Sequence, residues 1–432
     1  MPFDDGFLDQ TSTLRCLWIG RYIPYPADAG AKVYSAKMAE SLAAAGATVR
    51  FMGFGSADAV PAESRGVEWH SIPNGKRSEI AALFSRLPNA AAIDATQTYR
   101  QALESQLSEQ WDAIVLDGYG AGWALDRCLA YTYSVSPQPV LIHVSHNHEA
   151  ALWASMAANA QAALPKKLAL RHNAFKVRRL ERRMVRNVDL LSTITEEDGD
   201  ALLVGVPPET APRLLTLTPG YAGASVANRT ITQETARRVA IVGSFRWIVK
   251  QENLRRFVEI ADPVFAQNGI ALDVFGDVPE RLQSELKART HATEFHGFVD
   301  DPTAALAHAR MAVVPEVFGG GFKLKFLDYM FARVPVATLS DAAAGLPDAL
   351  RSAMIVRGDL QTLVQGIVAE IDRFTELNER QQRAFELAQT LYRWGDRGRH
   401  LRQAIVQIQR EHRAHRQMTP EALNSLSASP VK

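Results

Sequence analysis

The stretch Gly-Gly-Gly-Phe-Lys-Leu-Lys-Phe-Leu-Asp-Tyr at residues 319–329 is the part of the chain from which the fold is inferred. It follows the apolar segment 311–315, which predicts a buried strand, and it leads into a predicted helix over residues 322–333. The order is therefore strand, glycine turn and helix. This order is typical of α/β proteins with a parallel sheet.

The same stretch has the residue types that bind phosphate. Glycines let a ligand approach the backbone closely, and a helix N-terminus offers free N–H groups and a positive dipole end. Lys323 and Lys325 lie in the predicted first turn, where two cations are unfavourable unless an anion is near. Asp328 follows one turn later, where a carboxylate can bind hydroxyls. These residues together predict a pocket for a sugar nucleotide.

Length and composition bound the other possibilities. The 432 residues exceed one ordinary core, so we expect two or three domains. The formal net charge of +1 gives no overall attraction to nucleic acid or membrane. Cys16 and Cys128 are expected to be buried free thiols, which fits a reducing cytoplasm. Neither a signal peptide nor an apolar run of about 20 residues is present, so we expect a cytoplasmic protein, soluble or peripheral.

Predicted strands alternate with predicted helices in both halves of the chain, which implies parallel sheets covered on both faces. We expect strands at residues 14–20, 48–54, 111–116, 139–144, 188–193, 239–245, 271–275, 293–296, 311–315 and 334–338. Residues 360–392 predict one long helix. The expected organisation is an N-terminal domain (1–218), a linker (219–238), a C-terminal domain (239–394), a helix packing back on the N-terminal domain (395–418) and a disordered tail (419–432).

A series of short motifs in the second half resembles the retaining glycosyltransferases of family 4. The motifs are VGSFRW (242–247), DVFGD (273–277), FHGFVDD (295–301), GGGFKLKFLDYM (319–330), VPVAT (334–338) and AGLPD (344–348). The resemblance implies the GT-B fold, which is two Rossmann-like domains facing a cleft. It also implies that the C-terminal domain holds a nucleotide sugar, that the N-terminal domain holds the acceptor, and that no bound metal is required.

The resemblance assigns roles to individual residues. Asp328 matches the second of two family acids and would bind the ribose, whereas Gly320 stands where the first acid is expected. Glu316 is a possible replacement from a displaced position, and the glycine turn with two lysines resembles a subgroup of the family. The implied donor-binding residues are Gly243, Ser244, Lys250, Gly276, Phe298, Val299, Glu316, Gly319, Gly320, Gly321, Lys325 and Asp328.

Three residues are the expected catalytic groups: His146, Arg246 and Lys323. Arg246 and Lys323 would stabilise the departing diphosphate, the step that most needs positive charge. The alternative for Arg246 and Lys250 is an ordinary solvated turn, and for Lys323 an ordinary surface lysine.

A histidine cluster follows the strand at residues 139–144. His143, His146 and His148 have spacing that can suggest a metal site, but no cysteine or second cluster completes one. We expect a loop that lines the ligand site, with His146 orienting the reacting sugars. A structural histidine that caps the next helix is an equal alternative. The expected acceptor-binding residues are Gly30, Lys32, Asn147 and His148.

The segment 166–186, from Lys166 to Arg186, has nine basic residues and one acid, Glu181, with apolar residues interspersed. It is typical of a basic amphipathic helix that rests on anionic lipid, which suits a lipid-linked acceptor. A solvated helix with a core-facing stripe is an equal alternative. A nucleic-acid role is not expected, because aromatic interleaving and an extended basic surface are absent.

The expected function is hexosyl transfer from a nucleotide-diphosphate sugar to a glycan, lipid-linked or protein-linked hydroxyl, with retention, in surface polysaccharide or glycoconjugate assembly. No cofactor is expected. Two alternatives stay open. One is a sugar-nucleotide epimerase with the same architecture. The other is a non-catalytic nucleotide-binding subunit of a glycan-assembly complex. This alternative stays open because the first acid of the family motif is missing.

Overall fold

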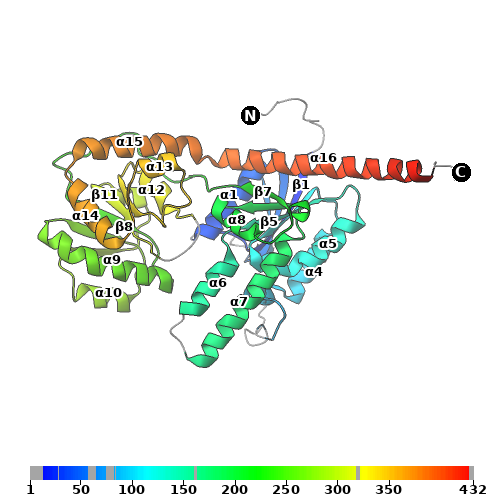
Figure 1. Ribbon diagram of the computed structural model, residues 1–432, viewed down its shortest axis with the longest axis horizontal. Helices are drawn as coiled ribbons and strands as arrows, with labels where there is room; N and C mark the ends of the chain where they lie inside the picture. The colour runs from blue at the N-terminus through cyan, green and yellow to red at the C-terminus, as the bar shows by residue number, and fades with distance from the viewer. Residues whose placement is uncertain are drawn as a thin grey trace. The chain divides into compact units, whose positions relative to one another are not determined.

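The computed structural model describes residues 13–27, 29–56, 65–73, 82, 84–159, 163–317 and 322–427 (Figure 1). It divides into two compact units. The N-terminal unit contains Met1–Thr218 and Trp394–Lys432, and the C-terminal unit contains Pro219–Arg393. The N-terminal unit is therefore built from two separate parts of the sequence.

The N-terminal unit has a seven-stranded parallel sheet in the order β3-β2-β1-β4-β5-β6-β7. The central strands β4 and β5 are buried along their whole length, as expected for a parallel sheet with helices on both faces. The strands are β1 (Leu14–Tyr22), β2 (Ala47–Phe54), β3 (Val67–Ile72), β4 (Ala113–Asp117), β5 (Val140–Ser145), β6 (Leu190–Thr193) and β7 (Arg213–Thr216).

Helices connect these strands and cover the sheet. They are α1 (Gly30–Ala44), α3 (Asn89–Asp94), α4 (Gln97–Gln106), η2 (Tyr119–Ala124), α5 (Leu125–Ser134), α6 (Glu149–Asn159), α7 (Leu164–Val185), α8 (Glu196–Leu203), η3 (Pro208–Thr210) and α16 (Trp394–Ser427). Helices α6 and α7 lie side by side as an antiparallel hairpin (Figure 1). No helix in the described ranges is both long and apolar enough to cross a bilayer.

The C-terminal unit has a six-stranded parallel sheet in the order β10-β9-β8-β11-β12-β13. Its strands are β8 (Arg238–Val242), β9 (Ala271–Phe275), β10 (Thr293–Gly297), β11 (Met311–Val314), β12 (Val336–Leu339) and β13 (Ile355–Arg357). Its helices are α9 (Ile248–Gln267), α10 (Glu280–Lys287), α11 (Pro302–Leu306), α12 (Lys325–Phe331), α13 (Asp348–Ser352), α14 (Leu360–Glu370) and α15 (Phe374–Leu391).

Both sheets contain the strand order 3-2-1-4-5-6 of the doubly wound dinucleotide-binding fold. The predicted α/β class with two Rossmann-like domains is therefore confirmed. The two cysteines are buried and free, also as predicted.

The segment predicted to be a linker, residues 219–238, packs on the C-terminal unit instead. Tyr221 stacks on Phe331 with ring centroids 4.1 Å apart. The Arg229 guanidinium donates hydrogen bonds to four backbone carbonyls of the unit, and Ile231 is buried in its core. The prediction was wrong because the prolines, glycines and threonines that break helical periodicity are also found in extended segments that pack against a domain.

Three further boundaries differ from the predictions. The helix predicted over 360–392 is broken into α14 and α15, and the break at Asp372 lets its carboxylate pair with Arg237 and Arg310. The helix predicted from residue 322 begins at Lys325, so Lys323 precedes it. Helix α16 continues to Ser427, beyond residue 419 where a disordered tail was expected, because good helix formers such as alanine, leucine and glutamate follow.

Helix α16 returns to the N-terminal unit and packs on α1. Arg397 donates two hydrogen bonds to Thr218, at the end of the first part of the unit. At Gly398 the two helices touch so closely that an added Cβ would lie 1.9 Å from the carbonyl oxygen of Ser41. Only glycine fits this contact without movement of a backbone.

We predict that Gly398→Ala destabilises the N-terminal unit by about 1–3 kcal/mol, because the new methyl group forces α16 away from α1. Urea unfolding monitored by circular dichroism measures the change. Gly395→Ala in the same helix is the matched control, since its Cβ would meet only the far end of Arg399 at 3.5 Å. Equal stability of the two variants would contradict this account of the packing.

Candidate functional site

Each sheet has a switch point where the strand order reverses, between β1 and β4 in the N-terminal unit and between β8 and β11 in the C-terminal unit. Ligands of open α/β sheets bind beyond the carboxyl ends of the strands at such points. The predicted site residues follow β1, β5, β8, β9, β10 and β11, beyond these carboxyl ends. We describe the two units separately.

In the N-terminal unit, the carboxylate of Asp117 at the end of β4 binds His146. The Nε2 atom of His146 lies 2.5 Å from Oδ1 of Asp117. A carboxylate only accepts, so Nε2 carries the proton. Trp18 from β1 donates its indole N–H to Oδ2 at 2.9 Å, and Ser35 from α1 also hydrogen-bonds to this carboxylate.

Burial and charge oppose each other in this pair. Burial disfavours the protonated form of His146, but the adjacent Asp117 carboxylate outweighs it and raises the pKa of the imidazole above its ordinary value. Burial likewise disfavours the ionised Asp117, but His146 and the hydrogen bonds from Ser35 and Trp18 lower its pKa. The pair is thus a buried carboxylate and an imidazole that readily holds a proton. The Nδ1 atom of His146 is buried and, among the described residues, has no hydrogen-bond partner.

Tyr34 fixes the other side of the imidazole. Its ring meets His146 edge to face with centroids 5.5 Å apart, and its hydroxyl donates to the Leu217 carbonyl at 2.7 Å. Trp394 at the start of α16 also packs on Tyr34, at 5.9 Å between ring centroids. The returning helix therefore supports the ring that holds His146.

Carboxylates surround the rest of the loop after β5. Glu181 from α7 accepts hydrogen bonds from the backbone N–H groups of Glu149 and Ala150, which begin α6. Its Oε2 lies 3.7 Å from Nε2 of His148, and the His148 backbone donates to Asp198 of α8 at 3.3 Å. This loop is held at both ends by acidic side chains.

Burial changes the acidity of several of these groups. It raises the pKa of Glu181 to about 7 despite the two backbone hydrogen bonds that favour the anion. It also raises the pKa of Glu149, which Asn147 and His146 only partly offset. For His148 burial lowers the pKa. His143 is buried beneath, its pKa lowered to about 4, and its Nδ1 donates to the Leu116 carbonyl, so it is a neutral core residue.

The remaining acceptor residues lie as follows. Asn147 donates to Glu149 at 3.2 Å, beside His146 and His148. Gly30 is the exposed first residue of α1, and Lys32 contacts the Pro26 carbonyl at 3.4 Å. The structure thus brings His146, Asn147 and His148 together, while Gly30 and Lys32 lie near the start of the helix that carries Tyr34 and Ser35.

Sequence reasoning missed Asp117, Tyr34 and Glu181. Asp117 directly follows the apolar strand predicted at residues 111–116, and its position at the carboxyl end was the available signal. Glu181 was the one acid in a basic segment, which was a signal of burial and pairing. Arg21 and Asp94 were also missed. Burial raises the pKa of Asp94 to about 6, and its carboxylate lies 3.1 Å from Arg21 at the end of β1.

In the C-terminal unit, two glycine backbones meet beyond β8 and β9. Gly276 has φ of +123°, and an added Cβ would lie 1.7 Å from the Gly243 carbonyl oxygen. The N–H of Gly243 donates to the Phe275 carbonyl at 3.0 Å. Only glycine adopts this conformation at this distance, so both predicted glycines shape the bottom of the candidate site.

Lysine and glutamate side chains lie against these glycines. Lys325 Nζ is 2.5 Å from Oε1 of Glu316, and both side chains are about nine-tenths buried, with 12% and 9% exposed. The same Nζ would be 3.5 Å from a Cβ on Gly243. Lys250 in the first turn of α9 is close enough to Lys325 and Glu316 to interact with both charges. Burial lowers the pKa of Lys250, the charge of Lys325 lowers it further, and the charge of Glu316 opposes this. The group carries two cations and one anion.

Asp328 lies on α12, one turn from Lys325. Burial raises the pKa of Asp328 to about 6, and the charge of Lys325 only partly offsets that effect. Lys323 is half-buried just before the helix. The predicted glycines Gly319, Gly320 and Gly321 lie outside the described residues.

The other predicted donor residues are more exposed. Arg246 pairs with Asp277, and four-fifths of its side chain is exposed. Ser244, two residues before Arg246, is exposed and lies next to buried Phe245. The Phe298 side chain is 75% exposed, whereas Val299 packs on the core of the unit.

One cluster of possible metal ligands has a structural role instead. Asp273, Glu294 and His296 are arranged like metal ligands, but Arg238 already pairs with both carboxylates, so the group is an ion-pair network.

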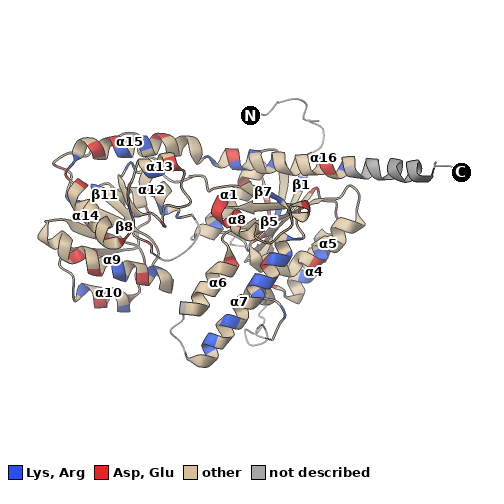
Figure 2. Ribbon diagram, in the orientation of Figure 1, with Lys and Arg blue, Asp and Glu red and all other residues tan. Residues whose placement is uncertain are grey.

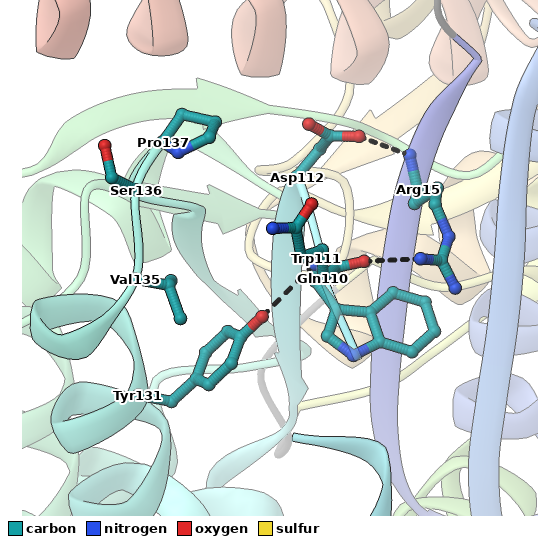
Figure 3. A pocket seen from close by; sticks show the side chains of 8 residues that line it. All are labelled: Arg15, Gln110, Trp111, Asp112, Tyr131, Val135, Ser136 and Pro137. Carbon is teal, nitrogen blue, oxygen red and sulfur yellow. Dashed lines mark hydrogen bonds between the residues drawn. The ribbon is translucent and has the colours of Figure 1, made fainter. Parts of the chain in front are cut away.

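A small pocket of about 110 Å³ lies near Arg15, Asp112 and Tyr131, at the amino end of β1 and β4 and therefore opposite the candidate site of the same unit (Figure 3). Its polar groups bind one another. The Arg15 backbone donates to Asp112 at 2.8 Å, and the Tyr131 hydroxyl donates to the Glu109 carbonyl at 2.7 Å.

Comparison with known protein families gives two matches. Residues 29–212 match the glycosyl transferase 4-like domain, and residues 236–372 match glycosyl transferases group 1. The two matches fall on different halves of the chain and together span most of it. No curated protein sequence matches the chain significantly.

Solved structures match over nearly the whole chain. A sucrose-phosphate synthase from Thermosynechococcus elongatus has a TM-score of 0.65 at 16% identity, covering 91% of this chain and 99% of that one. Anabaena HepE in complex with UDP and glucose has a TM-score of 0.61 at 10% sequence identity, and the match covers 91% of this chain and 100% of that one. WaaG, a glycosyltransferase involved in lipopolysaccharide biosynthesis, has a TM-score of 0.59 at 16% sequence identity, and the match covers 90% of this chain and 99% of that one. At these identities the similarity shows the fold.

We predict that Asp117→Asn lowers the pKa of His146 below its wild-type value and below the ordinary 6.5, because burial is then opposed only by the smaller effect of the Glu149 charge. Titration of the histidine ring protons by NMR measures it, with His146→Ala to assign the signal. Asp126→Asn, which changes an exposed carboxylate on α5, should leave the midpoint unchanged. The same midpoint in Asp117→Asn and wild type would contradict the assignment.

The sign of the stability change follows from the two shifts. The raised pKa of His146 contributes stability below pH 6.5, which is lost as pH rises through the folded pKa. The lowered pKa of Asp117 contributes stability above pH 3.8, and this stability is lost as the pH falls through the folded pKa of Asp117. The difference in unfolding free energy between wild type and Asp117→Asn should therefore be largest between pH 3.8 and 6.5.

Proposed function

Because the chain belongs to the GT4-like glycosyltransferases, we propose that it transfers a hexosyl group from a nucleotide-diphosphate sugar to an acceptor hydroxyl. The observation that carries the donor assignment is the group formed by Lys250, Glu316 and Lys325 against the glycine backbones at Gly243 and Gly276. A net positive group beside side-chain-free backbone suits a diphosphate.

Each donor residue has a role in this proposal. Lys325 and Lys250 meet the diphosphate, while Glu316 holds Lys325 in place and replaces the missing family acid from its displaced position. Asp328 binds the ribose hydroxyls, since a carboxyl group with a pKa of about 6 is mainly ionised at neutral pH and accepts hydrogen bonds from hydroxyl groups. Backbone near Phe298 and Val299 receives the base.

The proposed chemistry proceeds with retention and without a metal. The acceptor oxygen attacks the anomeric carbon on the face from which the diphosphate leaves. The leaving phosphate oxygen takes the acceptor proton, so the site requires no carboxylate pair of the hydrolase type. Positive charge from Lys323, Lys325 and Arg246 stabilises the diphosphate as it departs. Arg246 is exposed and must leave Asp277 to do so.

The N-terminal unit provides the acceptor side of the proposal. His146 orients the reacting sugars, and its protonated Nε2 is held by Asp117. Asn147 and His148, together with Gly30 and Lys32, contact the acceptor. We place the reaction in polysaccharide or glycoconjugate assembly, in the cytoplasm at the inner face of a membrane, with a glycan, lipid-linked or protein-linked acceptor.

One observation favours the rival, a non-catalytic subunit. Glu316 neutralises Lys325, so a cation that the resemblance assigns to the diphosphate is already paired. In that case the chain would keep the fold without strong nucleotide binding. A nucleotide-binding experiment separates the two functions.

We predict that a nucleoside diphosphate or its sugar raises the melting temperature of the wild type. Uridine diphosphate is the first to test, since HepE is solved with it. The stabilisation approaches about 2.7 kcal/mol at a hundredfold excess over Kd. It should be lost in Lys323→Ala and Asp328→Asn, and kept in Lys287→Ala, which changes an exposed lysine on α10.

Two other outcomes would count against the proposal. Equal stabilisation of all variants would move the nucleotide away from α12. No stabilisation with uridine, guanosine or adenosine diphosphates and their sugars would favour the non-catalytic subunit.

A further inference from the structure

Helix α7 presents apolar and basic side chains together on its exposed face. Leu164, Leu168 and Phe175 are 69%, 54% and 54% exposed, which is unusual for side chains of this size. Their spacings of four and seven residues place all three on one side of the helix. Arg171 and Arg178 follow Leu164 at intervals of seven, so they lie on the same side.

The exposed face carries no acid. The helix has one acidic residue, Glu181, and its side chain is buried. Arg183 pairs with Asp126, but for Arg171, Arg178 and Arg179 no carboxylate lies within ion-pair distance in the described part of the chain. Figure 2 shows lysine and arginine along the length of α7. This surface is positive and apolar at once.

The inner face of α7 fixes the direction in which this surface points. Leu180 and Met184 pack so tightly on η2 that a Cβ on Gly122 would lie 2.6 Å from the Met184 sulfur. Glu181 binds the first backbone N–H groups of α6. The helix therefore cannot turn about its axis to bury the exposed leucines and phenylalanine.

We propose that this face of α7 docks the N-terminal unit on an anionic phospholipid bilayer. Exposed leucine and phenylalanine side chains enter the region between headgroups and acyl chains, and the arginines bind the lipid phosphates on either side. A nucleic acid would use the arginines but leaves the three apolar side chains in water, so a bilayer fits the surface better.

The docked helix also places the acceptor, an inference that rests on the proposed function. Glu181 on its inner face contacts both His148 and the N-terminus of α6. The residues assigned to the acceptor are thus joined to the docking helix by direct contacts. A bilayer held on the outer face brings a membrane-anchored acceptor to that loop, so among glycan, protein-linked and lipid-linked acceptors we infer the lipid-linked class.

Co-sedimentation of the full chain with vesicles tests the docking. The wild type should bind vesicles of phosphatidylcholine with phosphatidylglycerol, and bind phosphatidylcholine alone much less. Leu168→Ser with Phe175→Ser should weaken the binding by about tenfold or more, through lost apolar burial. Arg171→Glu with Arg178→Glu should weaken it by about 30-fold or more and reduce its dependence on salt.

The matched controls make the same kinds of charge and polarity change at exposed positions outside α7. Arg281→Glu with Lys287→Glu on α10 and Val204→Ser after α8 replace exposed residues and should bind as wild type does. All the altered side chains are exposed, and circular dichroism confirms that each variant is folded. Binding lost in the arginine variant but unchanged in the serine variant would overturn the proposal and indicate a polyanion such as nucleic acid.

The same preparations separate this inference from the proposed function. A chain that is stabilised by a nucleotide but does not bind anionic vesicles overturns the docking alone. A chain that binds vesicles through α7 but responds to no nucleotide overturns the transferase proposal and with it the acceptor class, while the docking stands.

Discussion

The buried carboxylate of Asp117 is the interaction on which the N-terminal site depends. An ionised group out of water needs several partners, and these come from β1, α1 and the loop after β5. Trp18 and Ser35 satisfy part of the carboxylate, and His146 satisfies the rest. One charge thus draws three distant parts of the sequence to the switch point of the sheet and sets the protonation of the imidazole.

The C-terminal unit reaches the equivalent position by backbone proximity. The contact between Gly243 and Gly276 removes side chains from the ends of β8 and β9, and the space above is taken by Lys325 and Glu316. The two sheets share a strand order, yet one site is organised by a buried charge and the other by the absence of side chains. This difference underlies the roles that we propose for the two sites, a sugar hydroxyl in the N-terminal unit and a diphosphate in the C-terminal unit.

The sequence allowed most of the fold to be predicted, because buried parallel strands are continuous apolar runs. The strands that were missed, β3, β7 and β13, are edge strands, which are short or carry polar residues such as Glu68 and Arg213. In the sites, glycines and lysines were visible from local spacing. The pairing of Glu316 with Lys325, and of Arg246 with Asp277, depends on tertiary packing and has no local signal.

The split of the N-terminal unit into two segments has a consequence for how the protein is made. Pro219–Arg393 must be synthesised before Trp394 and the rest of α16 can reach α1. At about 5–20 residues per second this delay is on the order of ten seconds or more. During that time the second sheet can fold as an uninterrupted domain, while α1 and Tyr34 lack the helix that covers them. A ribosome that stops early therefore releases a chain whose exposed surface a chaperone or protease can recognise.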